Sequence, residues 1–421
     1  MAVLPRSLHS VLENLLETDI LIVGAGPAGA AAARVLAVAG RDVVVIDKAV
    51  FPRDKCCGDG LTTLALRELD ELQFDPKTVA SWTPVRAAWL RSPSGREVCL
   101  PLDGPGLFAA VTPRIELDNA LVEHARAAGA TVLDGHGFIN IIEQTAQHVT
   151  AQISGDDGQI RHVRARHLIA ADGMWSPVRK ALGLAVPGYL GEWHGFRQYA
   201  SHVTGTAKDR LYVWFDDDIL PGYAWSFPLP DGRVNIGFGI LRGGTHRVQD
   251  MKTQWPDILQ RPHVREALGP DVVFEGRHTA WPIPARIDHA VLTHDRVLFV
   301  GDAATATDAL TGEGIGQALL TGRLAAHAIL AASGLSAEAT RTHYEHAVRH
   351  HLFADHKMSL LLSRILAKPW GARGAVRVVG TSAWTRRNFA RWMFEDEPRA
   401  VLFTPSRWHR RFFHRPGAFG D

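Results

Sequence analysis

The chain is organised around residues 20–29, Ile-Leu-Ile-Val-Gly-Ala-Gly-Pro-Ala-Gly, and residues 43–47, Val-Val-Val-Ile-Asp. The apolar run over 20–23 has the length of a buried parallel strand, and 43–46 predicts a second one. Between them, the alanine-rich segment 30–39 predicts a helix whose small side chains let it lie close to a sheet. This order of strand, glycine turn, helix and strand predicts an α/β unit with a parallel sheet.

The glycines of the turn have the spacing G-x-G-x-x-G, and an acid follows at the end of the second strand. Gly24 permits the tight turn, Gly26 lets the backbone approach a pyrophosphate, and Gly29 allows the helix to pack closely on the strand. Asp47 is placed to accept hydrogen bonds from ribose hydroxyls, and its charge disfavours a 2′-phosphate. The pattern predicts binding of FAD or NAD rather than NADP; the alternative is a glycine-rich turn without a ligand.

Composition restricts the class of protein. The 421 residues are 46% hydrophobic, which allows two or three structural units. With 46 basic and 44 acidic residues the net charge is +2, so no nucleic-acid partner is expected. The three cysteines form no disulfide framework and no metal-ligand spacing, which favours the cytoplasm and no metal.

Membrane-spanning segments are not expected either. No stretch of about 18 uninterrupted apolar residues is present. Residues 1–18 predict a short amphipathic helix leading into the first strand. Peripheral contact with the inner face of the membrane stays open as an alternative to a purely cytoplasmic location.

Two further turns lie far from the glycine turn in the sequence. Asp172-Gly173 ends a buried strand, and Gly301-Asp302 ends another before the Gly312-Glu-Gly turn. Together with the glycine turn they resemble the flavoprotein monooxygenase superfamily, whose members share the para-hydroxybenzoate hydroxylase fold and bind FAD.

Two more stretches are similar to the geranylgeranyl reductase branch of that superfamily. Residues 51–61, Phe-Pro-Arg-Asp-Lys-Cys-Cys-Gly-Asp-Gly-Leu, are similar to the branch pattern F-P-R-x-K-x-C-G-x-G-L. Residues 223–228, Tyr-Ala-Trp-Ser-Phe-Pro, with Gly-Phe-Gly at 237–239, are similar to its Y-x-W-x-F-P…G-x-G substrate-cavity signature. The resemblance covers about residues 19–331.

The resemblance and the strand pattern together imply an α/β fold: a Rossmann-type FAD-binding domain, a second antiparallel-sheet substrate domain and C-terminal helices. We expect the FAD-binding domain in two parts, 1–185 and 286–335. The first part has its strand-helix-strand core at 19–47 and a hairpin insert at about 80–102. The substrate domain is expected over 186–285 and the helical region over 336–421.

The resemblance also implies roles for individual residues. The glycine turn holds the FAD pyrophosphate and Asp47 the adenosine ribose, while Arg114 reaches the phosphate or ribityl region. Asp302 binds the ribityl chain, and the turn at 312–315 presents backbone N–H groups and a helix N-terminus to the flavin ring. The full cofactor-binding set is Gly24, Gly26, Ala28, Gly29, Asp47, Lys48, Cys57, Gly58, Arg114, Asp172, Asp302, Gly312, Gly314 and Ile315.

Three aromatic residues and a cysteine form the rest of the predicted site. Tyr223, Trp225 and Phe227 alternate along one strand and therefore point to one face. They are expected to line an apolar substrate cavity; ordinary core packing is the alternative. Cys57 is the catalytic candidate as a proton donor beside the flavin, with simple packing as the alternative. Adjacent Cys56 is expected to be filler.

Three sets of polar residues near the predicted site each have two interpretations. Arg53 and Lys55 either neutralise phosphate or are solvated at the surface. Asp172 either faces the cofactor or only ends a strand and caps the next helix. Family members usually have Asn-Pro where this chain has Asp308-Ala309. Alanine there is expected to relax the loop facing the flavin, with Asp308 either a proton source or a solvated carboxylate.

The resulting expectation is an FAD-dependent oxidoreductase of geranylgeranyl-reductase type. It reduces isoprenoid C=C bonds of a prenyl lipid or quinone by hydride transfer from reduced flavin, with NAD(P)H or a small redox protein as electron donor. The alternative is an FAD-dependent monooxygenase that hydroxylates or epoxidises a hydrophobic metabolite; a halogenase and a non-catalytic flavin-bound adaptor are the remaining alternatives.

The C-terminal region has a composition of its own. From Arg386 to Asp421 it carries eight arginines against four acids, interleaved with aromatic residues. Basic, aromatic helices bind anionic lipid, so this region is the expected site of any peripheral membrane contact. The alternative is a helix that packs on the sheet with a solvated basic face.

Overall fold

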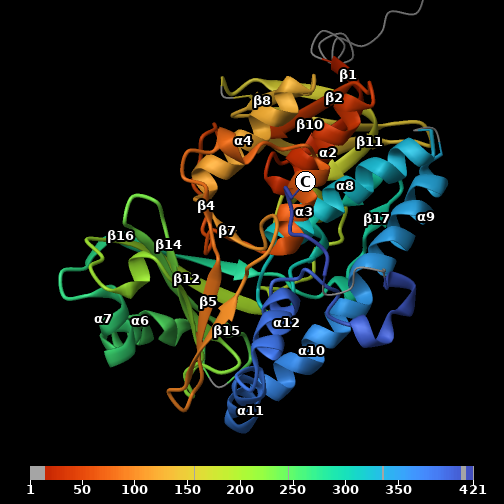
Figure 1. Cartoon of the computed structure of the whole chain (residues 1–421). Coiled ribbons are helices and arrows are strands. Elements are labelled where there is room, and N and C mark those ends of the chain that lie inside the picture. The colour runs from red at the N-terminus through yellow and green to blue at the C-terminus, as the bar shows by residue number, and fades with distance from the viewer. Residues whose placement is uncertain (1–14, 156, 245, 334–335, 409–413, 421) are drawn as a thin grey trace, which may run out of the picture.

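Two large β-sheets and a layer of C-terminal helices form the molecule (Figure 1). The computed structural model describes residues 15–155, 157–244, 246–333, 336–408 and 414–420. The first sheet has eight strands, ordered β17-β18-β11-β1-β2-β8, with β10 and β9 attached to β11. Its strands are β1 (Leu15–Val23), β2 (Val43–Asp47), β8 (Thr131–Asp134), β9 (Gly137–Gln144), β10 (Val149–Ser154), β11 (Ile160–Ala170), β17 (Thr293–His294) and β18 (Val297–Phe299).

The parallel strands of this sheet end in register. Val23 at the end of β1 aligns with Ile46 of β2 and with Ala170 of β11, and Ala170 aligns with Phe299 of β18. Because the carboxyl ends of parallel strands meet at one edge, the loops that follow these strands gather there. This register places turns from distant parts of the sequence beside the glycine turn.

The first strand begins earlier than the sequence predicts. Residues 15–18 belong to β1, where they pair with 162–165 of β11, so the expected helix over 1–18 is wrong for this part. Pairing with a long neighbouring strand outweighs the local amphipathic pattern. The rest of that expected helix, residues 1–14, lies outside the described residues.

Small side chains let the helices pack closely beside the first sheet. A Cβ on Gly322 of α8 would lie 2.1 Å from the backbone oxygen of Ala28 in α2, so the two helices touch through their backbones. Helix α2 lies between α8 and α4, and α3 packs on α8. These helices are α2 (Pro27–Val38), α3 (Thr63–Glu71), α4 (Arg114–Ala127), α8 (Ile315–Ala331) and α9 (Ala337–Val348), with the short α5 (Pro177–Ala181) after β11.

The second sheet has the order β16-β12-β15-β14-β13-β5-β6 and is antiparallel except where β13 meets β5. This confirms the predicted second domain type. On one face Trp255 of α6 stacks on Phe238 of β15, with 5.7 Å between ring centroids. The elements are β5 (Ala87–Arg91), β6 (Glu97–Pro101), β12 (Trp193–Ser201), β13 (Leu211–Trp214), β14 (Tyr223–Pro228), β15 (Val234–Leu241), β16 (Val273–Ile283), α6 (Met251–Gln260) and α7 (Pro262–Leu268).

The hairpin at about 80–102 forms as predicted, but it extends the second sheet rather than the FAD-binding unit. Strand β5 pairs in parallel with β13, with Ala88 opposite Leu211. Buried Leu90 and Leu100 of the hairpin belong to the same hydrophobic cluster as Val213 of β13. Shared burial with residues far along the chain therefore decides where the hairpin belongs.

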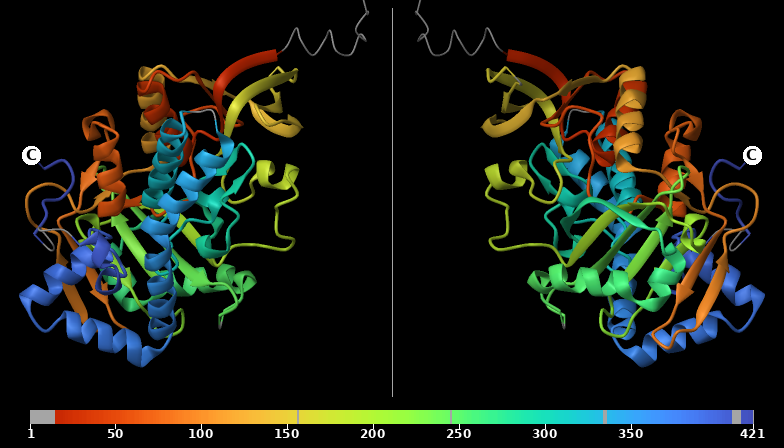
Figure 2. Two further views of the ribbon diagram at one scale, coloured as in Figure 1. Left: turned by 90° about the vertical axis from the view of Figure 1, so that its right-hand side faces the viewer. Right: turned by 90° about the vertical axis from the view of Figure 1, so that its left-hand side faces the viewer.

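The C-terminal helices close the far end of the molecule. Figures 1 and 2 place them (blue) at the end opposite β1. They are α10 (Ala354–Leu366), α11 (Pro369–Val379) and α12 (Ala383–Met393), and a π-helical turn at Arg349–Phe353 precedes them. A separate small sheet is formed by β3 (Gly60–Leu61), β4 (Thr83–Pro84) and β7 (Ala110–Val111), whose strands flank the hairpin in the sequence. Val376 and Ala390 share a cluster with Leu100 of β6. In the described part of the chain, no helix has the length and apolar character needed to cross a bilayer.

Candidate functional site

A cavity of about 810 Å³ runs from the glycine turn, past the second sheet, to the C-terminal helices. It collects nearly all the residues predicted from the sequence. Those that line it are Gly24, Gly26, Ala28, Asp47, Lys48, Cys57, Gly58, Arg114, Asp172, Tyr223, Trp225, Phe227, Asp302, Gly312, Gly314 and Ile315. Gly29 lies behind the wall and packs on the turn itself.

Each glycine of the turn has a separate steric reason. Gly24 has φ +102°, and a Cβ there would lie 2.3 Å from the Ala171 oxygen. A Cβ on Gly29 would lie 1.9 Å from the Gly24 oxygen. At Gly26 the closest neighbour is an Arg53 guanidinium nitrogen at 3.6 Å, so the backbone there is open toward the cavity. Gly26 caps α2 with no side-chain hydrogen bond, which leaves first-turn N–H groups free for an anion.

Two acids at the ends of strands face this end of the cavity. The Asp47 carboxylate accepts hydrogen bonds from the Ala25 nitrogen (2.8 Å) and the Ala49 nitrogen (2.9 Å), which fixes its position at the end of β2. Asp172 accepts from the Val178 nitrogen (2.9 Å) through one oxygen, while its other oxygen is buried without a partner among the described residues. Burial raises the pKa of Asp172 to about 6. Asp172 therefore both caps α5 and presents an unpaired oxygen to the cavity.

Arg114 is tied more tightly to its own helix than the sequence suggests. Its Nε and Nη2 donate to Asp118, one turn along α4, at 2.7 Å each. Arg53 reaches the same Asp118 carboxylate at 2.8 Å, so this residue is paired with an acid rather than solvated. The carboxylate thus holds two guanidinium groups at the cavity wall, where they form the cationic part of the site.

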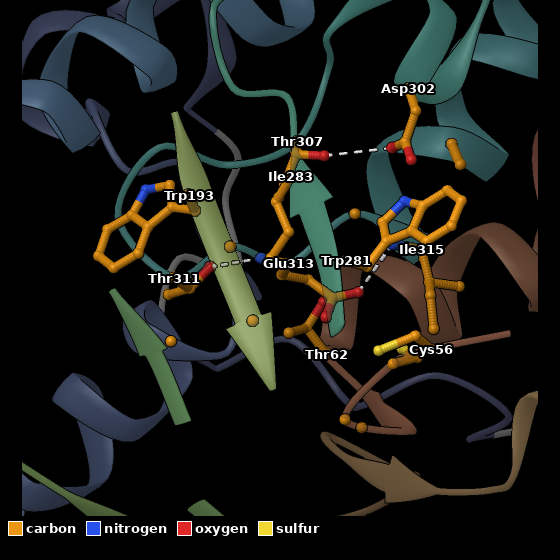
Figure 3. Close-up of a pocket in the computed structure, with 18 of the residues that line it drawn as sticks. Cys56, Thr62, Trp193, Trp281, Ile283, Asp302, Thr307, Thr311, Glu313 and Ile315 are labelled. Carbon is orange, nitrogen blue, oxygen red and sulfur yellow. Dashed lines mark hydrogen bonds between the residues drawn. The ribbon is translucent and has the colours of Figure 1, made fainter. Parts of the chain in front are cut away.

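The loop before α8 forms the opposite wall (Figure 3). Thr307 donates to the Asp302 carboxylate at 3.3 Å, and the Glu313 carboxylate accepts from the Ile315 nitrogen at 3.0 Å at the start of α8. Burial raises the pKa of Glu313 to about 7. Glu313, which sequence reasoning missed, is therefore a partly buried acid between the two predicted glycines.

Asp308 is buried rather than solvated, contrary to one of the two readings from the sequence, while the reading as a proton source stays a prediction. It is 7% exposed and accepts hydrogen bonds from Thr311 Oγ1 (2.7 Å) and Ser359 Oγ (2.6 Å), with Arg399 at 3.5 Å. Burial pushes the pKa of Asp308 up, but Arg399 and the two hydroxyls outweigh burial and hold the pKa below its usual range.

The loop at Ala309 is also held firmly, although alanine replaces the family's proline. The Trp193 Nε1 donates to the Ala309 oxygen at 3.1 Å, and Asp308 accepts from the Leu310 nitrogen at 3.2 Å. Side-chain hydrogen bonds therefore hold the loop at the place of the family's proline, and the expected relaxation of this loop stays a prediction.

The loop at 51–61 is anchored to the second sheet by a polar network that sequence reasoning missed. Buried Asp59 accepts from Tyr199 Oη (2.6 Å) and Asn235 Nδ2 (2.7 Å), and Arg197 donates to Asp54 at 2.9 Å. Burial raises the pKa of Asp59 to about 6. Asp59 lies inside one quoted motif and Asn235 close to the other, but only their contact across the fold gives these residues a role.

The two family motifs also pack directly on each other. A Cβ on Gly60 would lie 2.9 Å from the Phe227 ring, and one on Gly58 3.3 Å from it, so a larger residue would have to displace the ring. Trp225 donates through Nε1 to Asn235 at 3.1 Å, and Tyr223 donates through its hydroxyl to the Thr311 oxygen. The three aromatic residues share one face of β14 and line the cavity, as their alternation predicts.

Cys57 and Lys55 face the middle of the cavity. Burial raises the pKa of the Cys57 thiol to about 12, so the thiol keeps its proton at neutral pH. Lys55 lies over the Trp281 ring, 3.0 Å from its centroid, and its amine has no hydrogen-bond partner among the described residues. Burial lowers the pKa of Lys55 to about 8. Lys55 is thus a buried cation inside the cavity, not a solvated surface group.

The far end of the cavity is apolar and was not predicted residue by residue. Helices α10, α11 and α12 supply most of its lining there, from Leu362, Leu366, Val376, Val379, Phe389 and Met393. The sequence predicts helices over 336–421 but not that they line a cavity, because the helices are polar on one side and their other side has no local signal for a ligand. Among the described residues, no group of His, Cys, Asp and Glu could hold a metal ion.

The residues present fit FAD. The glycine turn is open at Gly26, the first turn of α2 has free amides, and Asp47 is fixed beside them. Asp172 and Lys55 line the cavity, and Asp172 Oδ1 and Lys55 Nζ have no hydrogen-bond partner within the described part of the chain, which favours a polar ligand there. The apolar end of the same cavity continues past the residues that would hold the cofactor.

Comparison with known proteins also indicates an FAD-binding protein. Residues 17–351 match the FAD binding domain family. The chain is 36% identical to the menaquinone reductase of Mycolicibacterium smegmatis over 73% of this chain and 75% of the relative. It is 31% identical to digeranylgeranylglycerophospholipid reductase 2 of Methanopyrus kandleri over 74% of this chain and 76% of that relative. A geranylgeranyl bacteriochlorophyll reductase-like structure from Thermoplasma acidophilum superimposes with a TM-score of 0.74 at 23% identity, covering 93% of this chain and 99% of that one.

Proposed function

The chain belongs to the FAD binding domain family and, within it, to the group that includes menaquinone and digeranylgeranylglycerophospholipid reductases, and from this premise we propose that it saturates C=C bonds in the prenyl chain of a quinone or lipid. It is an FAD-dependent oxidoreductase, and the resemblance to geranylgeranyl reductases is confirmed. The observation that carries the proposal is one cavity that joins a nucleotide cradle to a long apolar end.

Different residues along this cavity bind the cofactor, hold the substrate and supply a proton. Bound FAD supplies the two electrons for the double bond. The glycine turn and Asp47 fix the nucleotide, while Trp225 and Phe227 hold an apolar chain against the opposite wall. The apolar lining excludes water from the reacting carbons, which keeps protons available only from side chains. Cys57 is the candidate donor, because its thiol remains protonated and lines the cavity.

Membrane contact is the second part of the proposal. Residues 356–394 contain eight lysines and arginines and no aspartate or glutamate. On the same helices that line the cavity, Trp370 and Trp384 are each 69% exposed, and Leu361 and Val378 are more than half exposed. Exposed apolar side chains in a segment with an excess of basic residues suit the surface of an anionic bilayer. A prenyl chain would enter the cavity from the bilayer past Ile365, which lines the cavity and is also exposed.

The test is reduction of a prenyl substrate by purified protein. The FAD-loaded protein is reduced anaerobically with dithionite, which removes the choice between NAD(P)H and a redox protein as donor. Menaquinone and a digeranylgeranylglycerophospholipid are then added separately, and mass spectrometry follows the products. A gain of two hydrogen atoms per prenyl double bond is expected, and it should persist after air has reoxidised the quinone head group of menaquinone. A gain of oxygen after admission of air indicates the monooxygenase alternative, and unchanged probes overturn the proposal.

A further inference from the structure

A second cavity of about 420 Å³ lies on the other side of the loop before α8. Unlike the main cavity it is lined by many ionisable side chains, including Asp308, Asp355, His356, Glu395 and Arg399. Charged linings of this kind hold water and exchange protons readily. A proton supply therefore lies next to a cavity whose own reacting end is apolar.

Glu395 forms the wall between the two cavities. Its carboxylate lines the second cavity and accepts a hydrogen bond from Thr62 Oγ1 at 2.9 Å. Thr62 lines the main cavity, where Figure 3 draws it among the lining residues with Glu313. The other carboxylate oxygen of Glu395 accepts from Gln317 Nε2 at 2.9 Å. A hydrogen-bonded pair thus connects the two spaces.

The side-chain hydrogen bond of Thr62 is unusual for a residue at the start of a helix. It is the N-cap residue of α3, where a threonine side chain ordinarily accepts a hydrogen bond from the third residue of the helix. Here the hydroxyl makes no capping bond and turns to Glu395 instead. Glu395 itself has φ +62°, because it directly follows the C-cap of α12, where a left-handed residue commonly ends a helix. Thr62 therefore gives up its capping bond to make this contact, and the end of α12 holds Glu395 in place for it.

Three acids, Asp308, Glu313 and Glu395, lie near the cation Arg399, so not all three can be ionised. Arg399 lies 3.5 Å from Asp308 and 3.7 Å from Glu395, and Glu313 is the other acid acting on Glu395. Asp308 has four further hydrogen bonds and a lowered pKa, so it is the ionised partner of Arg399. Burial raises the pKa of Glu395 to about 8 and that of Glu313 to about 7.

We propose that Glu395 and Thr62 form a proton-transfer link that carries protons from the charged second cavity to the main cavity. The proposal rests on the proposed function, because saturating a double bond consumes two electrons and two protons. The electrons and one proton come from reduced FAD, and the second proton comes from the protein. A proton passes from the Glu395 carboxyl to the Thr62 oxygen while the Thr62 proton moves into the main cavity. There it replaces the proton that the donor, for which Cys57 is the candidate, gives to the second carbon, and Glu395 is left as a carboxylate. Water in the second cavity then reprotonates Glu395.

The kinetic test uses variants that keep shape and change only proton transfer. Thr62→Val removes the hydroxyl and Glu395→Gln removes the acid, and each should slow oxidation of the reduced enzyme by a prenyl substrate about 10²-fold. Thr62→Ser restores the hydroxyl and should recover the rate. Glu71→Gln is the matched control, because Glu71 lines the second cavity without reaching Thr62. Oxidation by ferricyanide, which takes electrons without a proton, should be unchanged in all variants.

A second readout needs neither substrate nor cofactor. Infrared spectra of the cofactor-free protein should show a protonated carboxyl band that titrates at about pH 8 and is absent in Glu395→Gln. Because the folded state holds a proton that the unfolded state has released, stability should fall as pH rises from the ordinary glutamate range toward about 8. Glu395→Gln should make this fall smaller.

The outcomes separate the two proposals. If the wild-type protein leaves every prenyl probe unchanged, the proposed function fails, while the infrared titration still decides whether Glu395 holds the proton. If prenyl substrates are reduced and both Thr62→Val and Glu395→Gln keep the wild-type rate, the link is overturned. Absence of the titrating carboxyl band in the wild-type protein also overturns it. A slow Thr62→Ser variant would assign Thr62 a purely structural role and count against the link.

Discussion

The two ends of the main cavity are built by different means. At the nucleotide end the contacts come from backbone and from residues close in sequence: the glycine turn, the start of α2 and Asp47, all within 20–47. At the apolar end they come from side chains of β14, the loop at 51–61 and the helices α10 to α12. Backbone contacts recognise a constant group such as a pyrophosphate, whereas side-chain walls adapt to a particular substrate.

Added side-chain volume should have different effects at the two ends of the cavity. At Gly24 and Gly29 of the nucleotide end a single added carbon collides with main chain, which has nowhere to move. At the apolar end an added carbon meets an aromatic ring that can shift. Substitutions at the first end should therefore abolish cofactor binding, while those at the second should weaken substrate binding and leave the cofactor in place.

The strongest test is Gly29→Val at the nucleotide end. Its Cβ would lie 1.9 Å from the Gly24 oxygen, so the turn and α2 cannot keep their positions. We expect purified protein without FAD, with a free energy of unfolding lowered by about 3 kcal/mol. Flavin absorbance and urea unfolding measure the two effects. Gly374→Ala is the control, since a Cβ there meets nothing within 4 Å; retention of FAD in Gly29→Val would contradict the steric argument.

The next effect concerns Asp308, in the loop before α8. Asp308→Asn leaves Arg399 buried without its ionised partner, so we expect a loss of about 3 kcal/mol in unfolding free energy. Thermal and urea unfolding of the FAD-loaded protein provide the measurement. Asp217→Asn breaks a half-exposed pair with Arg373 and should cost less than about 1 kcal/mol. Equal losses in the two variants would show that Asp308 does not stiffen the loop.

A reciprocal pair of variants separates the two ends. In Gly60→Ala the Cβ lies 2.9 Å from the Phe227 ring, so we expect unchanged FAD content and about tenfold weaker binding of a prenyl substrate. In Gly26→Ala the protein has room for the Cβ, but the cradle for phosphate is filled. We therefore expect weaker FAD binding in a stable protein. Flavin content and substrate titration test both; identical profiles for the two variants would break the comparison.

The smallest effect is expected outside the cavity. Trp370→Ala with Trp384→Ala should weaken binding to vesicles of phosphatidylcholine and phosphatidylglycerol about fivefold, without changing activity on a detergent-solubilised substrate. Cosedimentation measures the binding. Vesicles of phosphatidylcholine alone should bind the wild-type protein weakly, because they offer no anionic lipid to the helices. Binding that ignores both changes would assign these tryptophans no role at a membrane.

Much of the nucleotide end could be predicted from the sequence. The strand at 20–23, the glycine spacing and Asp47 are local signals, and each depends on backbone geometry that nearby residues alone set. The alternation of Tyr223, Trp225 and Phe227 likewise placed three side chains on one face before any neighbour was known.

The other features depend on contacts between distant segments. Only the tertiary structure pairs the hairpin of β5 and β6 with β13, ties Asp59 to Tyr199, and buries Asp308 against Arg399. The chain by itself determined an α/β flavoprotein with its nucleotide cradle, because covalent proximity fixes a turn. The fold decided which acids are buried and which helices close the substrate end, because burial and charge pairing depend on what packs on the other side.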